Sequence, residues 1–513
     1  EISACLVGSE MCIRDRLSLQ RLYSFRHALI RDAAYESLLR SKRRQYHGQI
    51  AAALQESFPE IVNANPELVA VHYTDAGLVE KAILFWQRAG HKALERSANQ
   101  EAIRHLTKGL DLLKSLPESP EHVQRELMLQ ISLGTALIAT KGFPSQDVER
   151  VYGRARQLCE HAGQSPQLFP VLWGLWMFYT SRGKHTAARE LAEQCLHLAQ
   201  TAEDPGLRLE AHHVLGVGFI ASGSFSQALD HLEQAIGIYN PREHGSHAYI
   251  YGHDPAAVGL IHASWALWFL GYPEQALKRY REGQDLAHRL NHPYTSATAA
   301  AFAAWFHQFY RNPKAVEESA SAAIRISSEH DFVFYRAMGL IMRGWALTEN
   351  AQVSEGLFQM RTGLDAYRDT GGRVLRPSFL SLLADAYGKA GQTEDALGVL
   401  AEAQALADEC EERWWQAELH RLKGELMLKS RGAPRAQHDD DEPERCFRQA
   451  LAIARAQKAK SLELRAAMSL SRLQARQLRR SEARETLRGI FASFTEGFDT
   501  PDLREAKTLL GQL

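Results

Sequence analysis

The sequence predicts an all-α protein in which helical hairpins stack side by side into a superhelix, preceded by a short segment of a different kind. Three observations predict this fold. A pattern of small residues recurs about every 40 residues between positions 183 and 483, as expected where each unit packs only on its neighbours. No stretch alternates apolar and polar residues for long enough to form a sheet. No apolar run approaches the roughly 20 residues of a membrane-spanning helix.

Two segments carry the repeat most clearly. LGVGFIASGSFSQALDHLEQAI places Gly216 in a first helix and Ala228 in a second, and LADAYGKAGQTEDALGVLAEAQ places Ala384 and Ala396 in the same positions. A small side chain at each position lets the two helices of a hairpin approach closely. The intervening Gly223 supplies the positive φ that ends a helix. The pattern resembles the tetratricopeptide repeat, a pair of antiparallel helices.

Weaker copies extend the array in both directions. Their anchors are Gly271, Ala276, Ala315, Gly344, Gly356 and Ala483. Between residues 188 and 396, successive second-helix anchors are 39 to 48 residues apart. This step exceeds the usual 34 residues of the repeat, so we expect elongated helices. A turn-rich insert over residues 240–255 explains the spacing of 48 residues between Ala228 and Ala276. An acidic insert over residues 430–444 lies in the longer interval between Ala396 and Ala483.

Both inserts contain side chains that could suggest a metal site. The acidic insert includes residues 438–441, HDDD, which we interpret as a solvated charge run. The other contains His244, His247, His253 and Asp254. Because Asp254 precedes Pro255, it is interpreted as the N-cap of a helix that opens with proline. The sequence therefore predicts no metal site.

The chain is expected to consist of three segments. Residues 1–16 lack the order of a secretory signal, since the basic residues come last, and LVGSEMCIRD resembles a translated sequencing adapter. We therefore expect an artefactual leader, with Leu17 as the first native residue. Residues 17–62 form the second segment, and residues 63–513 the helical array.

The second segment carries a family resemblance. SFRHALIRDAAYESLL followed by RRQYHGQIAAAL resembles the closing winged-helix part of bacterial signal-transducing (STAND-type) P-loop ATPases. The C-terminal FTEGFDTPDLREAKTLLGQL resembles the end of large bacterial proteins that join an adenylate or guanylate cyclase domain, an ATPase domain and a tetratricopeptide array. The resemblance covers residues 17–513. It implies that the second segment is the end of the ATPase winged-helix and arm region.

The resemblance also implies one nucleotide contact. In related ATPases a winged-helix histidine, usually followed by aspartate, contacts bound ADP, and His27 is the matching position. Here Ala28 takes the place of that aspartate. The contact would also need the missing ATPase domain, and the alternative is that His27 is satisfied by hydrogen bonds to the local backbone. No GxxxxGK[ST] loop and no paired cyclase aspartates occur, so the chain itself is expected to be non-catalytic and without a cofactor.

A binding groove is expected on the first helices of the hairpins, which line the concave face of such a superhelix. Aromatic side chains there could hold a protein, a peptide or a small ligand. The alternative is that they fill contacts between helices. The residues expected to lie near this groove are Trp173, His213, Trp265, Trp268, His307, Trp345 and Asp385.

Composition limits the classes of partner that we expect for this chain. A net charge of −1 on 513 residues supplies no field that would gather phosphates, which argues against nucleic acid. Outside the leader four cysteines remain, Cys159, Cys195, Cys410 and Cys446. Their wide spacing on apolar helix faces predicts buried thiols in a reducing, cytoplasmic compartment, with no membrane association.

These observations favour a sensor or regulatory array attached to an upstream ATPase and a cyclase. Two alternatives stay open. The parent protein could be an ATPase-type transcriptional regulator with a DNA-binding domain elsewhere, or the array could be a free-standing scaffold.

Overall fold

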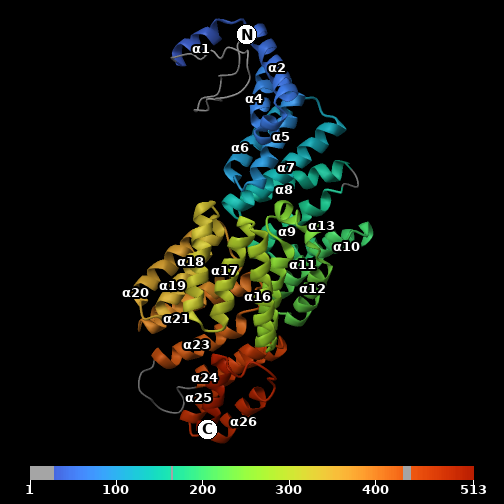
Figure 1. Cartoon of the computed structure of the whole chain (residues 1–513). Coiled ribbons are helices and arrows are strands. Elements are labelled where there is room, and N and C mark those ends of the chain that lie inside the picture. Colours follow the sequence, from blue (N-terminus) through green and yellow to red (C-terminus); the bar gives the residue numbers. More distant parts are fainter. Residues whose placement is uncertain (1–27, 163–165, 431–440) are drawn as a thin grey trace. The chain divides into compact units, whose positions relative to one another are not determined.

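The computed structural model describes residues 28–162, 166–430 and 441–513, and within these ranges it contains 27 helices and no strand (Figure 1). The predicted all-α superhelical class is confirmed. The predicted leader, His27 and the acidic residues 438–440 lie outside the described ranges. None of the described helices is both long and apolar enough to cross a bilayer.

The chain divides into two compact units, residues 1–133 and 134–513. The described helices of the first unit are α1 (Ala28–Ser37), α2 (Arg40–Ser57), α3 (Pro59–Ala64), α4 (Pro66–Ala76), α5 (Val79–Glu95) and α6 (Asn99–Leu113), and α7 (Pro120–Lys141) belongs to both units.

The first unit has one continuous hydrophobic cluster across α2 to α5. It contains Ala51 of α2, Val62 of α3, Tyr73 of α4 and Trp86 of α5, all buried. This cluster runs through the boundary expected at residues 62 and 63, because α2 packs on α4. A separate domain over residues 17–62 therefore stays a prediction.

The second unit consists of hairpins whose helices follow one another along the chain. After α8 (Gln146–Ala162), the pairs are α9 (Leu168–Ser181) with α10 (His185–Ala202), α11 (Pro205–Ala221) with α12 (Phe225–Ile238), α15 (Pro255–Leu270) with α16 (Pro273–Leu290), α17 (Pro293–Phe309) with α18 (Pro313–Glu329), α19 (Val333–Glu349) with α20 (Val353–Asp369), α21 (Arg376–Lys389) with α22 (Thr393–Glu409), α23 (Gln416–Ser430) with α24 (Asp441–Ala456), and α25 (Lys460–Arg476) with α26 (Arg480–Phe491). Two short helices, α13 (Pro241–His244) and α14 (His247–Tyr251), fill the first insert, and α27 (Pro501–Gln512) follows α26.

The small anchors lie where the two helices of a hairpin meet. In the second helices the anchor is the fourth residue after the N-cap, as at Ala228, which follows Ser224, and at Ala396, which follows Gln392; both alanines are fully buried. In α18 this position belongs to Val316, which is fully buried, whereas the predicted anchor Ala315 is partly exposed. The prediction of Ala315 is wrong by one residue.

The remaining anchors pack as close contacts or end helices. Those buried within helices are Gly216, Ala276, Gly344, Gly356, Ala384 and Ala483. A Cβ on Gly216 would lie 2.6 Å from Leu232 Cγ, so a larger residue there would force Leu232 to shift. Gly271 instead ends α15 with a φ of +88°, and Gly223 has a φ of +76°, which confirms the predicted left-handed turns.

Loops far apart in the sequence join successive turns of the superhelix. The Arg373 amide donates to the Ser181 carbonyl, and the Arg413 amide donates to the Ala221 carbonyl, both at 2.9 Å. Each pair is separated by 192 residues. Because this separation spans several hairpins, these bonds link one turn of the superhelix to the next.

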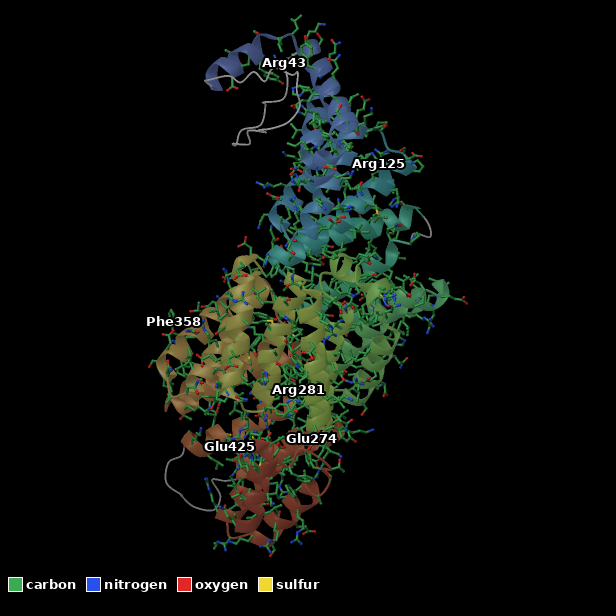
Figure 2. The ribbon with its side chains drawn as sticks, in the orientation of Figure 1. Arg43, Arg125, Glu274, Arg281, Phe358 and Glu425 are labelled. Atoms are coloured by element: carbon green, nitrogen blue, oxygen red, sulfur yellow. The ribbon has the colours of Figure 1, made fainter. Side chains whose placement is uncertain are left out.

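The C-terminal helices make further contacts of this kind. Arg465 of α25 donates to the Phe309 carbonyl at 2.7 Å and to Asp502 at 2.8 Å, while its guanidinium lies over the Trp268 ring. Figure 2 shows Glu274, at the start of α16, beside the C-terminal segment, where its carboxylate accepts from the Gly497 amide at 2.9 Å. The C-terminal segment therefore packs on hairpins near the middle of the chain.

Candidate binding cavity

A cavity of about 800 Å³, counted as the space between atoms and including its opening, lies within the second unit. First helices of five hairpins and several loops line it. The lining residues are Phe143, Met177, Thr180, Ser181, His213, Val217, Ile220, Ala221, His253, Val258, His262, Trp265, Thr298, Phe302, Phe334, Tyr335, Val374, Leu375 and Trp414. No lysine, arginine, aspartate or glutamate belongs to this lining.

Two neighbouring first helices show how the wall is built. In α15 the lining residues are Val258, His262 and Trp265, and in α17 they are Thr298 and Phe302. Residues three or four positions apart share one face of a helix. Each first helix therefore presents a stripe to the cavity, while its opposite face packs in the array.

The first insert supplies His253 to the wall and is fixed by buried polar contacts. His247 lies 2.7 Å from the carboxylate of Glu210 on α11, and burial raises the pKa of Glu210. The Asp254 amide donates to the Thr295 hydroxyl, and the Asp254 carboxylate accepts from the Ala257 amide at 2.8 Å. The predicted N-cap role of Asp254 is thereby confirmed. The insert is therefore anchored at both sides of His253.

Three imidazoles gather at this wall. Nε2 of His253 lies 3.5 Å from Nε2 of His213, and the rings of His213 and His262 are 6.2 Å apart. Burial lowers the pKa of His213 to about 4, and burial together with His213 lowers the pKa of His262 to about 3. Burial also lowers the pKa of His253 well below its usual value. All three rings are therefore neutral at pH 7.

Loops of the following turn also line the cavity. Val374, Leu375 and Trp414 line the cavity there, next to the backbone bonds made by Arg373 and Arg413. The Trp414 ring stacks on Trp265 with their centroids 6.0 Å apart. The cavity is thus lined by residues from two turns of the superhelix.

The residues predicted from the sequence divide into two groups. His213 and Trp265 line the cavity, and Trp173 borders it through its ring contact with His253, at 5.7 Å between centroids. Trp268 and Trp345 are buried elsewhere in the second unit. Trp268 stacks on Phe309.

The last two predicted residues lie on other contacts between helices. His307 bonds to the Tyr280 hydroxyl at 2.9 Å, and burial lowers the pKa of His307 to about 4. Asp385 pairs with Lys389 at 2.7 Å. Neither residue lines the cavity.

Several wall residues were not predicted from the sequence. His262 lies three residues before Trp265, so the helical period alone could have identified it. Phe334 and Trp414 reach the cavity from a helix start and from a loop of the next turn, and no local pattern marks such positions.

The described ranges contain buried thiols but no cluster of metal ligands. The four predicted cysteines are free and buried, which confirms that part of the prediction. No three histidine, cysteine, aspartate or glutamate side chains among the described residues come together as they would around a metal ion.

Comparison with known proteins supports the repeat fold. No family model matches the chain. It is 28% identical over 468 residues to an uncharacterized protein of Rhizobium meliloti, which covers 90% of this chain. The chain spans only 44% of the length of that relative.

Among solved structures, a Rap protein complexed with competence and sporulation factor aligns with a TM-score of 0.54 at 13% identity, covering 73% of this chain and 98% of that one. NprR in complex with its cognate peptide NprX aligns with a TM-score of 0.45 at 13% identity, covering 76% of this chain and 98% of that one. The likeness to the Rap protein shows a shared fold. The chain is therefore a tetratricopeptide-like array of helical hairpins.

Proposed function

We propose that this chain is a non-catalytic sensor array whose signal is a ligand bound in the cavity of the second unit. The observation that carries the proposal is the cavity itself, which is lined by first helices of five hairpins and by loops of the next turn. A ligand there would contact two turns at once. Its binding would favour the arrangement in which those turns are joined.

We further propose that the array regulates a larger bacterial signalling protein in the cytoplasm, with an upstream ATPase domain and a linked adenylate or guanylate cyclase. The motifs of residues 24–39 and of the C-terminal segment support this parent. In that protein His27 would contact nucleotide bound to the ATPase domain, and the array would bind no nucleic acid. The Rap protein of similar fold is complexed with competence and sporulation factor, which supports ligand binding by this chain.

A cavity-filling substitution tests the proposed function. Val217 lines the cavity and is half-buried, so Val217→Trp should fill the site without introducing a charge. Val71 on α4 is 41% exposed, and Val71→Trp is the matched control. Each protein is incubated with the low-molecular-weight fraction of a bacterial extract and re-isolated, and the retained compounds are identified by mass spectrometry.

We expect the unsubstituted chain and Val71→Trp to retain the same compound and Val217→Trp to lose it. Circular dichroism establishes that each variant is folded. Equal retention by a folded Val217→Trp would contradict the proposed site, whatever the chemistry of the compound.

A further inference from the structure

The cavity wall combines a large apolar surface with a small number of polar atoms that lack partners. Nε1 of Trp265, Nδ1 of His253 and the Thr180 hydroxyl are buried and have no hydrogen-bond partner among the described residues. The three side chains are 2%, 3% and 6% exposed. A buried polar group without a partner is costly, and a ligand that reached one of these atoms would remove that cost.

The wall also excludes charge. All lining side chains are apolar, aromatic, hydroxyl-bearing or imidazole groups, and the imidazoles are neutral. An ion placed there would lose its hydration without gaining an opposite charge. The ligand that fits carries no net charge at its buried end.

The backbone bonds between turns argue against an extended peptide as the occupant. The bonds from Arg373 to Ser181 and from Arg413 to Ala221 cross from one turn to the next beside the cavity. A peptide would also bring an amide and a carbonyl per residue, each of which needs a partner, and the wall offers few.

We infer that the cavity binds a neutral, largely apolar small molecule with a carbonyl or hydroxyl group, which accepts a hydrogen bond from the Trp265 indole N–H. This inference rests on the proposed function and deepens it by naming the class of ligand. The aromatic side chains of Phe302, Phe334 and Trp414 provide flat surfaces for the apolar body.

Fluorescent probes of one ring system test the charge requirement. N-phenyl-1-naphthylamine is neutral, and 8-anilinonaphthalene-1-sulfonate adds one negative charge to the same skeleton. We expect the neutral probe to bind at pH 7 and the sulfonate to bind at least about ten-fold more weakly. Val217→Trp should abolish binding of the neutral probe, and Val71→Trp should not.

The hydrogen bond is tested with prodan, a neutral naphthalene ketone whose emission reports hydrogen bonding to its carbonyl. Trp265→Phe keeps a flat ring but removes the N–H. We expect this variant to bind prodan about three- to ten-fold more weakly, with a blue-shifted emission. Binding of N-phenyl-1-naphthylamine, which has no carbonyl acceptor, should change less than about two-fold and so shows that the cavity is intact.

Two results would overturn the inference while leaving the proposed function standing. One is tight sulfonate binding that Val217→Trp abolishes, since it would show that the site accepts an anion. The other is retention of a peptide from the extract in the cavity with no binding of either neutral probe. Unchanged prodan affinity and emission in Trp265→Phe would remove the assigned hydrogen bond.

Discussion

Glu412 illustrates how one buried side chain holds the loops beside the cavity. It is 2% exposed and accepts hydrogen bonds from the Leu375 amide and the Trp414 indole at 3.1 and 2.5 Å. Leu375 and Trp414 both line the cavity. The carboxylate therefore fixes two parts of the same wall, although it does not reach the cavity itself.

Protonation of Glu412 should make stability depend on pH. Burial raises its pKa from 4.5 to about 7, so between these values the folded chain binds a proton that the unfolded chain does not. The stabilisation by this group is complete below pH 4.5 and is lost as the pH rises through 7. From pH 5 to pH 8 the free energy of unfolding should fall more in the unsubstituted chain than in Glu412→Gln, by on the order of 3 kcal/mol.

Urea unfolding at the two pH values measures this difference, and the shared titrating groups cancel in the comparison. Glu394→Gln, at an exposed position in the first turn of α22, is the control and should follow the unsubstituted chain. Parallel pH profiles for Glu412→Gln and the unsubstituted chain would contradict the assignment.

The glycines of α19 and α20 show what sets the distance between two helices of a hairpin. A Cβ on Gly344 would lie 2.6 Å from Met360 Cγ and 2.7 Å from the Gly356 carbonyl oxygen. Because one of these atoms is backbone, the helices would have to separate. Gly398 in α22, by contrast, has open space around the position of a Cβ.

Alanine should therefore act in opposite directions at the two positions. Gly344→Ala is expected to destabilise the chain by about 1–3 kcal/mol through overpacking. Gly398→Ala should stabilise it by roughly 0.5–1 kcal/mol, since alanine is the better helix former. Urea unfolding measures both. A Gly344→Ala chain as stable as Gly398→Ala would show that the helices are not held at this distance.

Much of the array at this scale could be predicted from the sequence. Small anchors and glycine turns mark most hairpins, but Ala315 was placed one residue early because α18 begins with the Asn312 cap and Pro313. Pro273 opens α16 in the same way, and the anchor Ala276 lies three residues after it. The same spacing from Pro313 gives Val316. Other turns have a positive φ at Arg311 and Ala351, where no glycine signals them.

The stripe that faces the cavity could be predicted only in part, for a physical reason. First helices such as α15 are buried on all sides, so the apolar pattern does not distinguish the cavity face from the faces packed in the array. Of the residues expected at the groove, His213 and Trp265 line the cavity, whereas Trp268, one turn further along the same helix as Trp265, stacks on Phe309 instead.

At the scale of the second unit, the decisive contacts join residues 192 positions apart, as between Arg413 and Ala221. Periodicity within a hairpin carries no information on how tightly the superhelix is wound, and so none on which loops meet. Trp414, which closes the cavity from the next turn, could not be assigned from the sequence for this reason.

The central claim is that the two turns enclose a binding site for a neutral, apolar molecule. Its most direct test is a crystal structure of the chain with 6-bromo-2-naphthol, in which the anomalous signal of bromine locates the ligand. The account predicts a single strong bromine peak in the cavity, with the hydroxyl group next to the Trp265 indole. A bound ligand with its bromine outside the cavity, and no peak among the side chains of the two turns, would contradict it.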